Sequence, residues 1–125
     1  MVAKTVAGFL NAYGGTLVIG IDDDGNPIGL ENDLATLPKR NVDGYQLYLR
    51  NLLNAAVGTD LSMRINIDFP TMDGKEVCVI RVPAAPRAVW ISRANDKILY
   101  VRNGNSTQPL DGEQAHRYIT SRWRE

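Results

Sequence analysis

The 125-residue chain contains one cysteine, one histidine and no apolar run near the length of a membrane span. A single cysteine excludes an internal disulfide, so we expect a reducing compartment, the cytoplasm. One cysteine and one histidine also cannot fill the tetrahedral site of structural zinc. Because a membrane helix needs about 18 consecutive apolar residues, and no signal-peptide pattern opens the chain, we expect no membrane partner.

The chain also lacks net charge, since 14 basic residues balance 14 acidic ones. This balance argues against a uniformly basic, polyanion-binding surface. The charges are nevertheless segregated: residues 1–36 hold one basic and five acidic residues, and residues 81–125 hold eight basic and four acidic ones. A segregated basic segment can form a face that attracts phosphate, or it can simply solvate the surface.

Hydrophobic spacing predicts a single α+β domain over residues 1–125, with helices packed on a mainly antiparallel or mixed sheet. Apolar residues at helical spacing predict helices over residues 2–13, 31–38, 42–57 and 112–123. We expect Asp43 to cap the third helix, Gly58 to end it, and Asp111 with Gln114 to form a capping box for the last one.

Alternating or continuous apolar runs predict strands over residues 17–21, 61–69, 76–82, 87–93 and 97–103. The first run, Leu17–Ile21, suits a strand that is buried on both faces, whereas Leu61–Phe69 alternates and has one wet face. We expect two antiparallel hairpins, one from residues 61–82 and one from residues 87–103. Gly14 and Gly15 end the first helix, and Asp24-Gly25 turns the chain after the first strand.

These motifs resemble the Schlafen-type, Alba-like family, in which a helix ending Phe-x-Asn precedes Gly-Gly, an apolar strand, Ile-Gly-x-Asp-Asp and a glycine turn. The matching positions are Phe9, Asn11, Gly14, Gly15, Ile19, Gly20, Asp22, Asp23, Gly25 and Gly29. A second matching block is Tyr100–Leu110. The resemblance implies a DNA-binding domain of bacterial transcription regulators, with a ribonuclease branch in the Schlafen proteins. It also implies a piece of a longer regulator, or a divergent member, because the family's upstream glutamate segment is absent.

The acidic run Asp22-Asp23-Asp24 is one candidate site, since carboxylates at a strand end can hold Mg²⁺ or Mn²⁺. The resemblance aligns Asp23 with a metal-binding aspartate of the Schlafen ribonucleases, and Asp22 lies beside it. The same run is also typical of a polar hairpin tip, because Asp-Gly is a common turn signal.

The second candidate site combines the segment 102–107 with arginines of the last predicted hairpin. Guanidinium, amide and hydroxyl groups contact phosphate and sugar in nucleic-acid complexes. By alternation, these arginines would flank Tyr100 on one face. The alternative is a strand-to-helix connection whose polar groups satisfy their own backbone. The predicted nucleic-acid-binding residues are Arg87, Arg93, Arg102, Asn103, Asn105, Ser106 and Thr107.

We therefore expect a nucleic-acid-binding module that works without catalysis and without a cofactor. DNA and RNA both stay open as partners, and so does a homo-oligomer. One alternative is a ribonuclease that uses Mg²⁺ or Mn²⁺ at Asp23 and Asp22. Another is a protein-interaction or assembly domain whose basic face meets an acidic protein.

Overall fold

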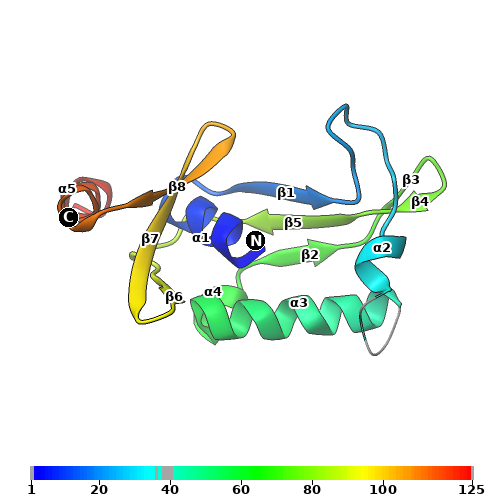
Figure 1. The fold of residues 1–125 in the computed structure, drawn as a ribbon, viewed down its shortest axis with the longest axis horizontal. Coiled ribbons are helices and arrows are strands. Elements are labelled where there is room, and N and C mark those ends of the chain that lie inside the picture. Colours follow the sequence, from blue (N-terminus) through cyan, green and yellow to red (C-terminus); the bar gives the residue numbers. More distant parts are fainter. Residues whose placement is uncertain (1, 36, 38–40, 125) are drawn as a thin grey trace.

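The computed structural model describes residues 2–35, 37 and 41–124 (Figure 1). Its helices are α1 (Val2–Asn11), α2 (Glu31–Leu34), α3 (Val42–Val57), α4 (Thr59–Ser62) and α5 (Gly112–Arg122). Its strands are β1 (Gly15–Ile19), β2 (Asn66–Asp68), β3 (Thr71–Met72), β4 (Lys75–Glu76), β5 (Cys78–Val82), β6 (Ile91–Arg93), β7 (Asp96–Asn103) and β8 (Ser106–Leu110). Helices and antiparallel strands together confirm the predicted α+β class. None of the described helices is long and apolar enough to cross a membrane.

The strands form a central sheet, a small β3–β4 hairpin and a second three-stranded sheet. The central sheet has the order β1-β5-β2, and the second has the order β6-β7-β8. Figure 1 shows α3 running along the central sheet, and α1 standing between that sheet and β7. Helix α1 contacts both sheets, so it joins the two halves of the core. The larger half contains Val6 and Leu10 of α1 packed with Leu49 and Leu53 of α3.

Asn11, at the end of α1, explains how the second sheet opens. Strand β6 pairs with β7 only as far as Ile91 opposite Ile98, so in the same register Val89 and Tyr100 would face each other two residues further on. The fully buried Asn11 amide lies between them instead. Its Nδ2 donates to the carbonyls of Val89 (2.9 Å) and Tyr100 (2.8 Å), and its Oδ1 accepts from the Val89 N–H (2.8 Å). The side chain therefore replaces backbone pairing that the separated strands lose.

The adjacent glycines Gly14 and Gly15 are required for two different reasons. Gly14 has φ of 81°, and a Cβ there would lie 2.6 Å from the Val82 carbonyl oxygen. Gly15 has no positive φ, but a Cβ there would overlap the ring of Phe9. The close approach of Phe9 to the first residue of β1 thus needs a glycine.

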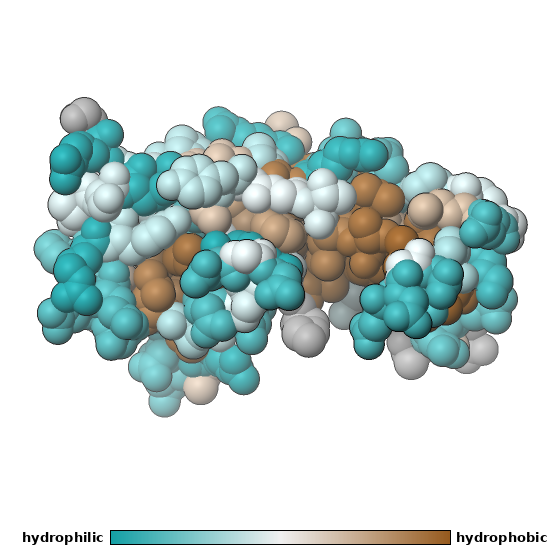
Figure 2. Space-filling model, turned by 90° about the horizontal axis from the view of Figure 1, so that it is seen from above, coloured by the Kyte–Doolittle hydropathy of each residue, from teal (hydrophilic) through white to brown (hydrophobic). Residues whose placement is uncertain are grey.

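Strand β1 differs from its prediction, because it is not buried on both faces. It pairs with β5 on one side, and its residues alternate between partly buried and exposed, with Thr16 and Val18 exposed. β1 is an edge strand of the central sheet. Space-filling atoms seen from above show apolar surface along this edge (Figure 2). A continuous apolar run can belong to such an edge strand as well as to a central one, and the sequence pattern did not separate the two.

Two predictions about the middle of the chain need correction. Helix α3 has the predicted bounds and ends at Gly58, but its cap is Asn41, whose Oδ1 accepts from the Gly44 N–H at 2.8 Å. Asp43 instead lies in the first turn. The predicted strand over residues 61–69 shrinks to β2, because Thr59–Ser62 forms α4. The predicted 31–38 helix reduces to α2, and residues 36 and 38 lie outside the described part.

Helix α5 begins with the predicted capping box of Asp111 and Gln114. Its far end docks on the end of α1, where helix carbonyls lack intrahelical partners. Tyr118 Oη donates to the Asn11 carbonyl at 2.6 Å, and Arg122 Nη2 donates to the Ala12 carbonyl at 2.7 Å. Two side chains of α5 therefore satisfy the carbonyls of Asn11 and Ala12, at the end of α1 and just beyond it.

Candidate nucleic-acid interface

Helix α1 and strand β7 form a seam with Tyr100 at one end. The Tyr100 ring is buried, and the Lys4 ammonium lies 5.4 Å from its centroid. Arg93 Nη1 donates to the Tyr100 hydroxyl at 3.0 Å. These side chains border a hollow of about 330 Å³. Two cations therefore contact one aromatic residue, one over its ring and one at its hydroxyl.

Arg102 lies two residues further along β7, on the same face as Tyr100 by strand alternation. Its guanidinium carbon is 5.0 Å from the Phe9 ring centroid. Its Nε donates to the Gly104 carbonyl (3.2 Å), and its Nη1 donates to Thr107 Oγ1 (3.0 Å). Nη2 has no hydrogen-bond partner among the described residues, so it remains available to a ligand. We call Lys4, Arg93, Tyr100 and Arg102 the α1–β7 seam.

The seam carries uncompensated positive charge. Within the described residues, no carboxylate lies within 4.0 Å of Lys4, Arg93 or Arg102. Arg87 differs, because its Nη2 lies 2.8 Å from Asp60 Oδ2. The hydrogen bond from Arg87 holds the pKa of the Asp60 carboxyl below its ordinary value. Arg87 lies before β6 rather than in it, so the strand predicted over residues 87–93 was too long and its alternation does not apply to Arg87.

The predicted 102–107 connection is a tight hairpin between β7 and β8. Arg102 is paired with Thr107, and Asn103 with Ser106. Asn103 and Asn105 are exposed at its tip, and Ser106 Oγ accepts from Gln108 Nε2 at 2.6 Å. The structure thus places these predicted residues together at one end of the second sheet.

The acidic run forms a turn stabilised by its own side chain. Asp22 Oδ1 accepts from the backbone N–H of Asp24 (3.0 Å) and of Asn26 (2.8 Å). Asp23 and Asp24 are exposed. Among the residues that the structure describes, no three His, Cys, Asp or Glu side chains lie together in a way that could hold a metal ion. The hydrogen bonds of Asp22 and the exposure of Asp23 are those expected for a polar hairpin tip.

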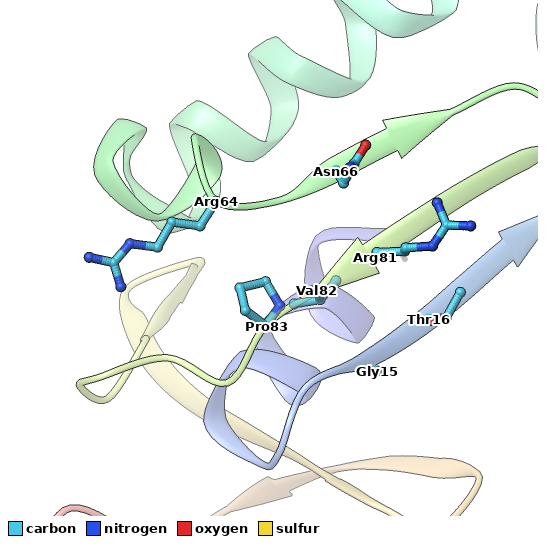
Figure 3. Close-up of a pocket in the computed structure, with 7 residues that line it drawn as sticks. All are labelled: Gly15, Thr16, Arg64, Asn66, Arg81, Val82 and Pro83. Carbon is cyan, nitrogen blue, oxygen red and sulfur yellow. The ribbon is translucent and has the colours of Figure 1, made fainter.

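A second polar surface lies on the central sheet, on the face turned away from α1. Thr16, Arg81 and Asn66 are direct neighbours on β1, β5 and β2. Figure 3 shows them with Arg64 and Pro83 around a groove of about 400 Å³, the two guanidinium groups pointing toward opposite ends. Arg81 Nη1 lies 2.6 Å from Asp68 Oδ2, so the charge of Arg81 is neutralised by this carboxylate.

This groove was not predicted, although one signal for it exists in the sequence. The alternation of residues 61–69 assigns Arg64, Asn66 and Asp68 to the wet face of a strand, and β2 has that exposure pattern. The alternation does not give the register in which β2 pairs with β5, and this register places Arg81 opposite Asn66. Pairing partners of antiparallel strands are fixed by tertiary contacts and not by the spacing along one strand.

The fold and these surfaces define a small α+β domain with a cationic seam on one side. The chain belongs to the Schlafen, AlbA_2 family, whose model matches residues 1–111. No curated protein matches the sequence. A similar solved structure is that of the DIP2311 protein from Corynebacterium diphtheriae, with a TM-score of 0.65 and 24% identity. The match covers 97% of this chain and 21% of that one, so this chain spans about a fifth of that protein's length.

Proposed function

We propose that this domain binds nucleic acid, DNA or RNA, through the α1–β7 seam, as a non-catalytic module of a transcription-regulator-like protein. The observation that supports this most directly is the charge of the seam. Lys4 and Arg93 converge on Tyr100, Arg102 follows on the same face, and none of the three forms an ion pair with a carboxylate in the described part of the chain. A site with several unpaired cations attracts a phosphate backbone.

The chemistry of the hairpin tip suits the same ligand. Arginine grips phosphate with two parallel N–H donors, and amide and hydroxyl groups reach phosphate and sugar oxygens. Asn103, Asn105, Ser106 and Thr107 supply such groups beside Arg102. Membership of the Schlafen, AlbA_2 family supports an association with nucleic acid as well.

A fluorescence-anisotropy titration with single- and double-stranded DNA and RNA, at two salt concentrations, tests this proposal. We expect affinity to fall steeply with salt, with a log–log slope near one per phosphate contacted. Arg93→Ala and Arg102→Ala should each weaken binding by roughly fivefold to tenfold and reduce that slope by about one. Arg102→Lys should keep part of the affinity, because the charge is retained but the paired donors are lost.

Arg117→Ala is the matched control, because Arg117 is exposed on α5 and paired with Glu113 at 2.6 Å. Circular dichroism shows whether each variant is folded. The proposal is overturned if the wild-type domain binds none of the four nucleic acids, or if Arg93→Ala and Arg102→Ala bind as tightly as Arg117→Ala. The first result would favour an acidic protein partner instead.

We propose further that binding needs no cofactor and leads to no cleavage. Mg²⁺ or Mn²⁺ would enter only if the domain were a ribonuclease. Incubating the domain with a structured RNA and Mn²⁺ tests this, with Asp23→Asn as the comparison. Intact RNA is the expected result. Cleavage by the wild type that disappears in Asp23→Asn would contradict the proposal.

A further inference from the structure

A second hollow, of about 300 Å³, lies between the β7–β8 hairpin, the end of α1 and α5. It is lined by the apolar residues Val101, Leu110 and Ala12 and by two tyrosines, Tyr13 and Tyr118. Figure 2 shows apolar surface framed by polar atoms toward the end of the molecule where β7 and β8 lie. We call this the tyrosine hollow. Its α5 side lies beyond residue 111, where the family match ends.

Tyr118 makes a fixed wall of the tyrosine hollow. Its hydroxyl is bonded to the Asn11 carbonyl (2.6 Å), and its ring meets the Trp123 ring edge-on, with centroids 6.1 Å apart. Trp123 is itself anchored, because its Nε1 donates to the Ala85 carbonyl at 2.8 Å. An aromatic wall held at both ends is already in position before a ligand arrives, which lowers the entropy cost of binding.

Tyr13, the other tyrosine that lines the hollow, is unusual because 87% of the residue is exposed. It therefore adds almost nothing to the core. The Arg122 guanidinium carbon lies 5.4 Å from its ring centroid, and Arg122 is tied to the Ala12 carbonyl. Tyr13 also borders a smaller hollow with Arg122 and Ser121, so its ring stands between two concave surfaces. An aromatic ring backed by a cation and open to solvent is a ready stacking platform.

Polar groups at the rim match the edges of a nucleobase. Asn103 presents an amide that can both donate and accept. Gln108 Nε2 donates to Ser106, and its Oε1 accepts from no donor in the part of the chain that the structure describes. Arg102 also borders the hollow, but its guanidinium contacts Phe9 and Thr107 on the opposite face of β7. Concave, mostly apolar hollows with a few convergent polar groups are typical of small-ligand sites.

We propose that the tyrosine hollow holds one unpaired base of a single-stranded nucleic acid, stacked on Tyr13. This inference rests on the proposed function and specifies that the bound nucleic acid is single-stranded. A base in a duplex is stacked on both faces and cannot enter a hollow, whereas an unpaired base can splay out and stack on an aromatic ring. Asn103 and Gln108 bind the base edge.

Binding of Tyr13→Ala to a single-stranded oligonucleotide and to a duplex of the same sequence tests the proposal. Loss of one base stack should weaken single-strand binding roughly fivefold to a hundredfold, and leave duplex binding unchanged. Tyr13→Phe should bind like the wild type, because stacking needs the ring and not the hydroxyl. Tyr48→Ala is the control, since Tyr48 is 49% exposed on α3.

A 2-aminopurine base in the oligonucleotide should lose fluorescence on binding to the wild type and not on binding to Tyr13→Ala. If single strands bind but Tyr13→Ala binds them equally well, the tyrosine hollow is not the base site, and the proposed function stands. If no nucleic acid binds at all, the proposed function itself fails. If a mononucleotide binds as tightly as the oligonucleotide, the hollow is a site for free nucleotides. The proposal that it holds a base of a single strand is then overturned.

Discussion

Asn11 shows how one side chain at the residue scale can decide the geometry of a sheet. Its amide makes three buried hydrogen bonds, to the Val89 N–H, the Val89 carbonyl and the Tyr100 carbonyl. No other side-chain amide among the described residues is fully buried. The position matters to the seam, because Tyr100 carries both the Lys4 contact and the Arg93 hydrogen bond.

Asn11→Ala should lower the free energy of unfolding by about 3 kcal/mol, because it leaves a buried N–H and two buried carbonyls without partners. Urea denaturation measures this. Asn11→Asp should be at least as destabilising, since a carboxylate can accept from the Val89 N–H but cannot donate to either carbonyl. Asn51→Ala, on the exposed side of α3, is the control. A loss below about 0.5 kcal/mol for Asn11→Ala would contradict this role.

The sequence identified Asn11 only as a motif position, and it assigned both glycines to the end of the first helix, although only Gly14 has a positive φ. The reason for Gly15 is the ring of Phe9, six residues earlier, and no local pattern reports that contact. The partners of Asn11 are 78 and 89 residues away. Long-range contacts of this kind follow from how the elements pack. A single sequence therefore shows that such residues are unusual, but not what they touch.

At the element scale, the central strand β5 carries a titratable group inside the core. Cys78 is fully buried. Burial raises the pKa of the Cys78 thiol to about 12 from an ordinary value of 9.0. Burial also raises the pKa of Tyr45 on α3 and of Tyr118 on α5. All three groups are neutral when protonated, so folding favours their protonated forms.

These shifts predict that stability falls as pH rises above 9. Below pH 9 the Cys78 thiol is protonated in both states, and its contribution is constant. Between pH 9 and 12 the unfolded state loses the proton first, at up to about 1.4 kcal/mol per pH unit. Urea unfolding at pH 8, 9 and 10 measures the slope. Cys78→Val should flatten it, and an equal slope in both proteins would contradict the assignment.

The elements themselves were predicted unevenly, for physical reasons. Helix α3 was predicted with its bounds, because sixteen residues at helical spacing end at a glycine with φ of 92°. Strand β8 was missed, since Pro109 and the polar residues before it read as a connection. Its strand conformation comes from pairing with β7. Short segments take their structure from their neighbours, while long helices carry their own signal.

For the whole molecule, zero net charge means that binding has to depend on where the charges lie. The seam and the sheet groove lie on different sides of the central sheet. On the groove side, Arg81 is neutralised by Asp68. On the seam side, Asp96 is the direct cross-strand neighbour of Arg93, yet the two are not bonded. Under the proposed function, the nucleic acid therefore binds on the seam side and not on the groove side.

Two substitutions that each remove one negative charge test this sidedness. Asp96→Asn, beside Arg93, should tighten nucleic-acid binding about two- to threefold at physiological salt, because the removed charge lies within about one Debye length, 8 Å, of the proposed phosphate path. Asp68→Asn, on the far face, should leave the affinity within error of the wild type. The same anisotropy titration measures both.

The pair keeps net charge equal, so a difference between the variants reports where the charge was removed, together with the release of Arg81 from its ion pair in Asp68→Asn. Both variants replace a carboxylate with an isosteric amide at an exposed site, and a loss of fold is therefore not expected. Raising the salt to 0.5 M should erase the effect of Asp96→Asn, because screening shortens the reach of the charge. If Asp68→Asn tightens binding more than Asp96→Asn does, the nucleic acid lies across Arg81 and Arg64, and the groove of Figure 3 replaces the seam as the interface.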